Sequence, residues 1–194
     1  GGEEINVNDV EKAHDLCPHL QIMNHYGPTE TTIGSIARFL DFETFPGYKT
    51  APTIGKPINN TDVYILDKSC HMVPIGVVGE LFIGGDGVGM GYLNRPGLTS
   101  ERFRPLITLI KEKNKSFSGG VGGRFYKKAP LLYHTGDLAR WHIDGHIEFL
   151  GRSDHQVKIR GHRVEPGEIE THLLKYNGVT ETVVIAREKR NKEK

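Results

Sequence analysis

Apolar and polar positions at the start of the chain recur with periods that predict one helix and two strands. Apolar residues from Val10 to Cys17 fall on one face of a helix, which we expect Asn8 to cap. The apolar run that follows predicts a buried strand over residues 20–26, and residues 33–40 predict a second strand. This order of elements indicates part of an α/β layer.

From about Pro46 the pattern changes to short strands separated by turns. Residues 63–67 and 79–84 predict two strands, and Asp144-Gly145 predicts the turn of a hairpin. The glycines that follow residue 83 predict tight turns, because no helix comes after them at the distance that a phosphate-binding loop requires. Residues 109–130 are polar and predict a surface loop. Together these features indicate a β-barrel.

The last part begins at a polar link around Asp154, a suitable place for a hinge. Residues 156–165 predict a small hairpin, and Pro166 suits the first position of a helix that Asn177-Gly178 closes. A final strand is expected at residues 182–186. We therefore predict an α/β fold with a β-barrel, in three parts: the end of an α/β core subdomain (1–45), a β-barrel subdomain (46–152) and the start of a small α+β lid (153–194).

Composition excludes several classes of protein. The formal net charge is +1, from 25 basic and 24 acidic residues, which argues against a nucleic acid or a membrane surface as partner. No apolar run approaches the roughly 20 residues of a membrane span. Cys17 and Cys70 lack the spacing of a zinc site or a disulfide framework, so we expect a reduced, cytoplasmic setting.

Candidate chemistry is concentrated around the turn at Gly27-Pro28. Thr29 can donate a hydrogen bond to a phosphate oxygen, and the Glu30 carboxylate can hold a magnesium ion. Just before the turn, Tyr26 offers a flat face to a purine and the Asn24 amide can read a base edge. The alternative is a solvated turn that follows an ordinary core tyrosine.

Two further residues have side chains that suit a nucleotide. Asp137 is expected on a bend after an apolar strand, where its carboxylate can accept hydrogen bonds from both hydroxyls of a ribose. The alternative is an Asx-type turn cap. Arg152 carries a forked set of donors that can reach a phosphate or a ribose.

The motif Asn-x-Tyr-Gly-Pro-Thr-Glu at residues 24–30 resembles a core motif of the amino-acid-activating adenylation domains of nonribosomal peptide synthetases. These domains belong to the acyl-adenylate-forming superfamily. Three more blocks resemble the same family in the same order, at residues 79–103, 131–141 and 151–170. The sequence departs from the family pattern at Gly89 and Met90, where Ala and Arg are usual, and at His134, where Arg is common.

The resemblance implies a reaction in two halves. An amino acid attacks the α-phosphate of ATP to give aminoacyl-AMP, and the acyl group then passes to the phosphopantetheine thiol of a carrier protein. ATP and Mg²⁺ are the implied cofactors, and a peptidyl carrier domain is the implied partner. The positions that match the family's catalytic residues are Thr29, Glu30 (also the metal ligand) and Lys158 in the loop near Gly161. The positions that match its nucleotide-binding residues are Asn24, Tyr26, Asp137, Phe149 and Arg152, and Asp154 matches its hinge. The positions that match its substrate pocket are Gly1, His25, Ile33 and Gly34.

The pocket positions favour an acidic substrate. An imidazole at His25 beside glycines gives free volume and a polar donor, which resembles the partial pattern of aspartate-activating domains, with asparagine as the nearest competitor. The alternative is that His25 only packs against the pocket wall.

The family's phosphate loop, the acidic residue that grips the substrate amino group and the lysine near the end of the lid are not found in these 194 residues. We therefore expect the missing remainder of the domain to be required, and this polypeptide alone to be inactive. Two other functions stay open, a stand-alone acyl- or aryl-CoA ligase and a non-catalytic docking fragment.

Overall fold

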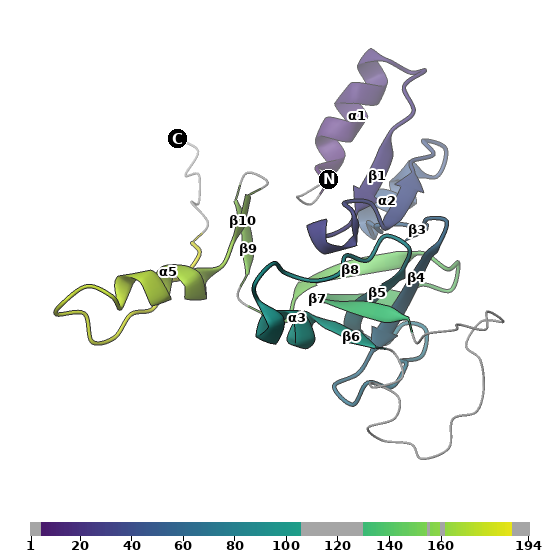
Figure 1. Cartoon of the computed structure of the whole chain (residues 1–194). Helices are drawn as coiled ribbons and strands as arrows, with labels where there is room; N and C mark the ends of the chain where they lie inside the picture. The colour runs from purple at the N-terminus through teal and green to yellow at the C-terminus, as the bar shows by residue number, and fades with distance from the viewer. Residues whose placement is uncertain (1–4, 106–129, 155, 160–161, 188–194) are drawn as a thin grey trace, which may run out of the picture. The chain divides into compact units, whose positions relative to one another are not determined.

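The structure is a computed structural model and describes residues 5–105, 130–154, 156–159 and 162–187 (Figure 1). The chain divides into two compact units, the first of which ends at Ser153 while the second begins at Asp154. Within the described ranges, no helix has the length and apolar character needed to cross a membrane. Most of the loop predicted at residues 109–130 lies outside the described residues.

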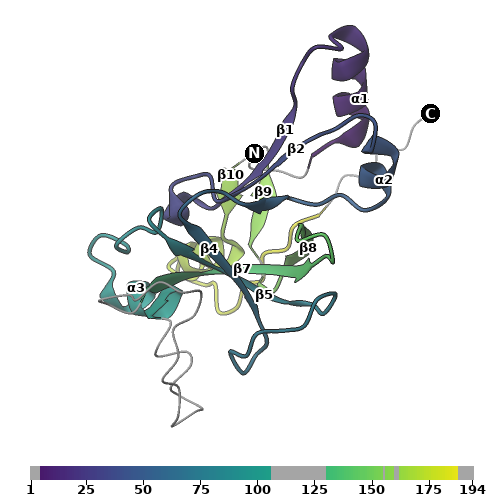
Figure 2. The same cartoon turned by 90° about the vertical axis from the view of Figure 1, so that its right-hand side faces the viewer.

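The first unit begins with two helices and a small antiparallel sheet in the order β1-β2-β3 (Figure 2). Its elements are α1 (Val7–Leu16), β1 (Met23–Tyr26), the 3-10 turn η1 (Thr29–Thr31), β2 (Ile36–Phe39), α2 (Phe45–Thr50) and β3 (Lys56–Pro57). Both predicted strands exist but are shorter than predicted. A cluster of apolar side chains, which includes Val10 and Tyr48, packs α1 against α2 and the segment after β2.

The predicted helix cap at Asn8 is wrong. The helix begins two residues earlier, and the side chain of Asn6 caps it by accepting hydrogen bonds from the backbone N–H of Asn8 at 3.0 Å and of Asp9 at 3.3 Å. The Asn6 carbonyl already accepts the bond from the Val10 N–H at 3.1 Å, which makes Asn8 part of the first turn.

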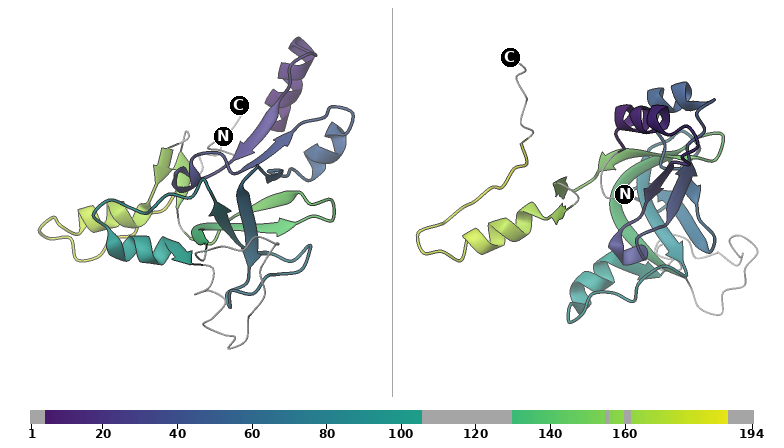
Figure 3. Two further views of the ribbon diagram at one scale, coloured as in Figure 1. Left: turned by 45° about the vertical axis from the view of Figure 1, so that its right-hand side comes forward. Right: turned by 90° about the horizontal axis from the view of Figure 1, so that it is seen from above.

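A five-stranded antiparallel sheet forms the rest of this unit. Its strands are β4 (Thr61–Leu66), β5 (Gly79–Gly85), β6 (Phe103–Pro105), β7 (Leu131–Trp141) and β8 (Ile147–Arg152), and α3 (Pro96–Arg102) leads into β6. The long strand β7 pairs with β5 along one edge; along the other edge its start pairs with β6 and its end with β8 (Figure 3). Among the described strands no pairing closes this sheet into a ring, so the predicted β-barrel is not confirmed.

The predicted hairpin at Asp144-Gly145 is confirmed. The backbone N–H of His142 donates to the His146 carbonyl at 2.8 Å, and Gly145 adopts a φ of +78° in the turn. The hairpin joins the end of β7 to β8, and it thereby sets Asp137 opposite Arg152 in the strand register.

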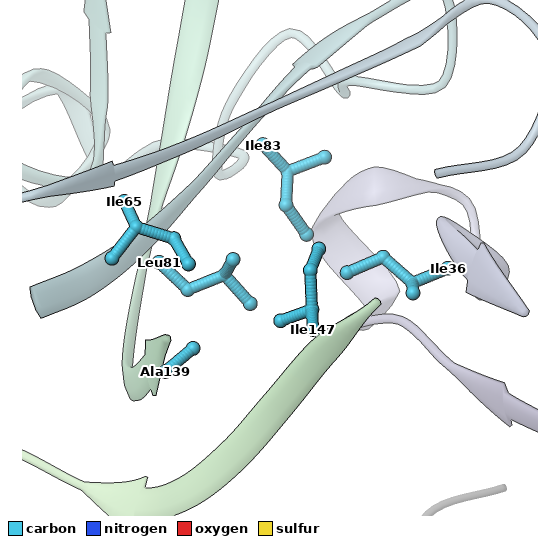
Figure 4. Packing of buried hydrophobic residues seen from close by; sticks show 6 residues of the cluster. All are labelled: Ile36, Ile65, Leu81, Ile83, Ala139 and Ile147. Atoms are coloured by element: carbon cyan, nitrogen blue, oxygen red, sulfur yellow. The ribbon is translucent and has the colours of Figure 1, made fainter. Parts of the chain in front are cut away.

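A shared core joins the two sheets of the first unit. Its fully buried members come from β2, β4, β5, β7 and β8, and they are Ile36, Ile65, Leu81, Ile83, Ala139 and Ile147 (Figure 4). Tyr26 and Trp141 pack against this cluster. Each large aliphatic side chain buried in this way contributes about 1.5–3 kcal/mol to folding, so the core holds β1 firmly against β7 and β8.

The second unit contains β9 (Val157–Ile159), β10 (His162–Val164) and α5 (Pro166–Leu173). β9 and β10 form the predicted small hairpin, and Pro166 occupies the first helical position as predicted. The helix ends at Leu173, before the Asn177-Gly178 turn that we predicted would close it.

The predicted strand at residues 182–186 is wrong, because this segment has no regular secondary structure. A strand needs a hydrogen-bonded neighbour. In the ranges that the structure describes, no strand pairs with residues 182–186, and the Val184 N–H donates instead to the side chain of Glu170 at 2.8 Å.

Candidate functional site

A buried polar cluster lies where β1, β7 and β8 meet. The Arg152 guanidinium donates from Nη1 to Asp137 Oδ1 at 2.7 Å and from Nη2 to the Thr135 carbonyl at 3.1 Å. The Tyr26 hydroxyl donates to the other carboxylate oxygen, Asp137 Oδ2. Asp137 is 5% exposed, so the sequence has brought a charged pair and a phenol together inside the protein. We call Tyr26, Asp137 and Arg152 the carboxylate cluster.

The position of Asp137 differs from the prediction in one respect. It does not follow a strand on a bend but lies within β7, next to an irregularity in the pairing with β8 between Asp137 and Ala139. Gly136, with a φ of +76°, allows the local kink. The kink turns the Asp137 side chain into the interior, where Thr135 Oγ1 accepts its backbone N–H at 2.9 Å.

Burial and charge determine the protonation of Tyr26 in the carboxylate cluster. Burial, with the charge of Asp137, raises the pKa of Tyr26 well above its ordinary value, so its phenol stays protonated and donates the hydrogen bond. The guanidinium of Arg152 neutralises the carboxylate. The ionised carboxylate of Asp137 acts only as a hydrogen-bond acceptor, as a contact with a ligand hydroxyl requires.

Phe149 is also at this place. It lies on β8, and its ring is tilted by 40° against that of Tyr26, with 6.3 Å between the centroids. Four of the five residues predicted to bind the nucleotide are therefore neighbours in space, although they come from three separate strands.

Asn24, the fifth residue, uses its amide differently from the prediction. Its Nδ2 donates to the Tyr48 hydroxyl at 3.0 Å and to the Thr53 carbonyl at 3.1 Å. The Asn24 amide thus binds both α2 and the segment that follows it. A contact of Asn24 with a base edge stays a prediction, and it would have to use the acceptor Oδ1.

Thr29 and Glu30 lie on η1, directly after Gly27-Pro28. A side chain at Gly27 would place its Cβ 2.1 Å from the Ile33 carbonyl oxygen, so this tight turn requires glycine. Thr31, the last residue of η1, is buried, and its Oγ1 lies 2.7 Å from Ser35 Oγ. Thr29 and Glu30 therefore belong to a turn whose backbone is tightly held.

A loop from the glycine-rich segment supports this turn from the other side. The backbone N–H of Gly89 donates to the Glu30 carbonyl at 2.8 Å, and Thr32 Oγ1 donates to the Gly87 carbonyl at 2.7 Å. A Cβ at position 87 would lie 3.0 Å from the Thr31 carbonyl oxygen. The close approach of two main chains therefore accounts for glycine at position 87.

The sequence did not reveal Tyr92, which ends this loop. Its hydroxyl donates to Glu30 Oε1 at 2.6 Å. The two residues are 62 positions apart, and no local pattern links them. The family block drew attention to the segment, but only the packing of the loop against η1 shows the contact.

The residues around Glu30 suit a magnesium ion that arrives with a nucleotide. Mg²⁺ is usually bound by one or two carboxylates together with substrate phosphates and water. Glu30 supplies one carboxylate, and no group of three or more metal-ligating side chains occurs in the described parts of the chain. This donor set fits a shared metal rather than a cage made by the protein alone.

Two of the four predicted pocket residues lie against each other. A Cβ at Gly34 would lie 2.2 Å from His25 Nε2, so the imidazole covers the Gly34 main chain. Ile33 is 69% exposed and has a φ of +67°. Gly1 lies outside the described residues.

The remaining predicted residues belong to the second unit. Asp154 is its first residue, and Asp154 Oδ1 accepts the backbone N–H of Gln156 at 3.2 Å. Lys158 lies on β9 with an exposed side chain, and Gly161 is outside the described residues. The roles of Asp154 and Lys158 stay predictions.

A second polar cluster anchors the end of the first unit. His134 Nε2 lies 2.7 Å from Glu80 Oε1, and the His134 ring stacks on Phe82. Ser153 Oγ donates to the same Glu80 oxygen at 3.1 Å, and the Ser153 N–H donates to the Gly136 carbonyl at 2.9 Å. Burial acts to raise the pKa of Glu80, but the bonds and charge of His134 and the bond from Ser153 outweigh it and hold the pKa below its ordinary value.

Comparison with known proteins agrees with this geometry. Residues 1–93 match the family model described as AMP-binding enzyme. The chain is 45% identical over 190 residues to bacitracin synthase 3 of Bacillus licheniformis, with 97% of this chain and 3% of that protein covered. It is 44% identical over 194 residues to gramicidin S synthase 2 of Brevibacillus brevis, with 100% of this chain and 4% of that protein covered.

Two solved structures of adenylation proteins are also similar to this chain. A structure of PA1221, an NRPS protein containing adenylation and PCP domains, has a TM-score of 0.75 at 27% identity and covers 97% of this chain and 34% of that one. An artificially fused adenylation-PCP di-domain NRPS from Klebsiella oxytoca, NpsA-ThdA, has a TM-score of 0.68 at 26% identity, with 97% of this chain and 31% of that one covered.

These similarities place residues 1–93 in the AMP-binding enzyme family. Nearly the whole chain is similar to part of an adenylation domain of the nonribosomal peptide synthetase type, which confirms the resemblance found in the sequence. The α/β class of the fold agrees with these neighbours. The chain spans only a small share of the synthetases that it matches and about a third of the solved adenylation proteins. The two other candidate functions, the CoA ligase and the docking fragment, are not favoured by these relatives.

Proposed function

We propose that this chain contributes the nucleotide-binding edge of a domain that activates an amino acid with ATP and passes it to the phosphopantetheine thiol of a carrier protein. The observation that carries the proposal is the convergence of Tyr26, Phe149, Asp137 and Arg152 at one place, beside a turn that presents Thr29 and Glu30. The family relationship supports the reaction, and the two solved neighbours described above contain carrier domains.

Each residue has a role that its chemistry allows. The Asp137 carboxylate accepts from the ribose hydroxyls, while Arg152 supplies its counter-charge and Tyr26 and Phe149 offer apolar ring surface near the base. Thr29 donates to a phosphate oxygen. Glu30 holds Mg²⁺, which when bound neutralises phosphate charge during attack by the substrate carboxylate.

In this proposal, a movement of the second unit switches the domain from the first half-reaction to the second. Rotation about Asp154, the first residue of that unit, brings the loop around Lys158 and Gly161 to the adenylate for thioester formation. We also propose that residues 46–152 complete the β-barrel of the family, and that the protein works in the cytoplasm.

For the substrate we propose an amino acid with a short acidic side chain, aspartate before asparagine. The contact of the His25 imidazole with the Gly34 main chain supports a polar donor next to a position without a side chain. A hydrogen bond to a charged group contributes about 1.5–3 kcal/mol, which corresponds to a preference of tenfold or more. In a complete adenylation domain that includes this chain, we expect aspartate-dependent ATP–pyrophosphate exchange that His25→Ala weakens; a clear preference for an apolar amino acid would refute this choice of substrate.

The test of the main proposal is Glu30→Ala in a complete adenylation domain that includes this chain. Loss of one preorganised charge-stabilising group typically lowers the rate by a factor of about 100 to 1,000. We expect ATP–pyrophosphate exchange to fall by that factor, while transfer from preformed aminoacyl-AMP to the carrier thiol changes less. Unchanged exchange would remove Glu30 from the site. The chain alone, which spans about a third of the solved relatives, is expected to show no exchange.

A further inference from the structure

The contact between Tyr92 and Glu30 has a consequence for the metal. We infer that Tyr92 is a positioning residue, whose hydroxyl fixes the Glu30 carboxylate in the orientation that receives the magnesium ion of the nucleotide. The inference rests on the proposed role of Glu30 as the metal ligand. It is carried by the 2.6 Å hydrogen bond from the Tyr92 hydroxyl to Glu30 Oε1.

Glu30 needs an outside support because its own turn is short. The element η1 has three residues, and a glutamate side chain has three rotatable bonds before its carboxylate. The turn fixes the backbone of Glu30 but not the plane of the carboxylate. A bond to one carboxylate oxygen restrains rotation about the last side-chain bond and so lowers the entropy lost when a cation binds.

Tyr92 is itself held firmly enough to act as this support. Its backbone N–H donates to Thr99 Oγ1 at 2.9 Å, and its ring meets that of Phe103 edge to face, with 5.4 Å between centroids. Gly91, with a φ of +131°, lets the chain pass so close to Thr99 that a Cβ there would lie 2.3 Å from Thr99 Cγ2. The Tyr92 hydroxyl is therefore held in place by its own loop, which is bonded to Thr99 of α3.

The direction of this hydrogen bond follows from the chemistry of the two groups. An ionised carboxylate only accepts hydrogen bonds, so the phenolic O–H of Tyr92 is the donor to Glu30 Oε1. A donor to a ligating carboxylate is a common second-sphere partner of a metal, and removal of such a partner typically lowers metal affinity or activity 10–100-fold.

The test is Tyr92→Phe in a complete adenylation domain that includes this chain, with ATP binding measured by calorimetry with and without Mg²⁺. The substitution removes only the hydroxyl and leaves the ring against Phe103. We expect the Mg²⁺-dependent gain in ATP affinity to fall about 10–100-fold, while affinity for ATP without Mg²⁺ stays within about twofold of the wild type.

Two companion variants separate the possible causes. Thr99→Val removes the bond to the Tyr92 backbone and loosens the same loop but leaves the hydroxyl, so we expect it to keep most of the Mg²⁺-dependent gain. If Thr99→Val loses as much of the gain as Tyr92→Phe, or if Tyr92→Phe weakens metal-free binding equally, the hydroxyl has only a structural role and the inference is overturned.

Glu30→Gln distinguishes failure of the inference from failure of the proposed function. If Glu30→Gln leaves the Mg²⁺-dependent gain unchanged, Glu30 is not the metal ligand and both ideas fall. If Glu30→Gln abolishes the gain but Tyr92→Phe preserves it, only the role of Tyr92 is refuted. In the double variant we expect no loss beyond that of Glu30→Gln, because Tyr92 acts through this carboxylate.

Discussion

Replacement of Asp137 by Asn should destabilise the first unit strongly. The side chains of Asp137 and Arg152 are only 8% and 13% exposed, and their charged atoms lie 2.7 Å apart. Asparagine has nearly the same volume but no charge, so the buried guanidinium would lose its counter-charge. Removal of one partner of a buried ion pair costs about 3–5 kcal/mol. We expect the lower end, about 3 kcal/mol, because Arg152 keeps its bond to the Thr135 carbonyl.

The chain provides its own probe for this measurement. Trp141 is the only tryptophan and packs against the core of the first unit, so its fluorescence during urea unfolding reports on that unit. A loss of about 3 kcal/mol is a large part of the 5–15 kcal/mol by which domains are usually stable. The matched control is Asp86→Asn, the same chemical change at an exposed position, which should stay within about 0.5 kcal/mol of the wild type.

A double-mutant cycle tests the cause. Arg152→Met alone leaves the Asp137 charge buried without its guanidinium, and the double variant removes both charges. We expect the double variant to be more stable than the sum of the two single losses predicts, with a coupling of about 2–3 kcal/mol. A loss below about 1 kcal/mol for Asp137→Asn, or additive single losses, would refute the view that the ion pair holds this cluster together.

The other predictions concern three more places. Gly91→Ala should cost about 2 kcal/mol of unfolding free energy, through its positive φ and the crowding beside it, whereas Gly97→Ala in α3 should be neutral or stabilising; equal effects in urea unfolding would contradict this. The pKa of Glu80 is lowered in the folded protein, so its stabilising effect is present above the ordinary glutamate pKa and is lost as the pH falls through the lower folded value. Glu80→Gln should therefore destabilise at pH 7, and the difference from wild type should shrink towards pH 3; a constant difference would count against it. In a complete domain, Lys158→Ala should slow thioester transfer more than ATP–pyrophosphate exchange. Asp154→Pro should preserve only one of the two half-reactions, because proline fixes φ near −65° and hinders rotation at the hinge. Equal losses of both half-reactions in Lys158→Ala would show that the lid assignment is wrong.

Local signals in the sequence predicted the elements whose structure is decided locally. The Asp-Gly turn of the β7–β8 hairpin and the proline that begins α5 both act through backbone geometry at their own position. The cap of α1 shows the limit of such signals. Asn6 and Asn8 are both good caps, and the choice between them is made by the hydrogen bonds of the first turn rather than by residue type.

Features that depend on distant partners could not be predicted in the same way. Residues 182–186 have the composition of a strand, but pairing decides whether a strand forms. Similarly, the family motifs indicated Asp137 and Glu30 as candidate residues. They did not show that Arg152 and Tyr26 bind Asp137, or that Tyr92 binds Glu30. The contacts of Tyr26 and Tyr92 join elements that meet only after the two sheets share their core, and the contact of Arg152 depends on the register of β7 and β8.

The contact between His25 and Gly34 couples two positions of the proposed substrate pocket. A Cβ at position 34 would lie 2.2 Å from His25 Nε2, so a side chain at position 34 would force the imidazole to move. A library that varies position 34 while histidine remains at 25 would therefore report on a displaced His25 as well as on the new residue. Paired changes, with a small residue at 25 whenever 34 gains a side chain, would separate these two effects.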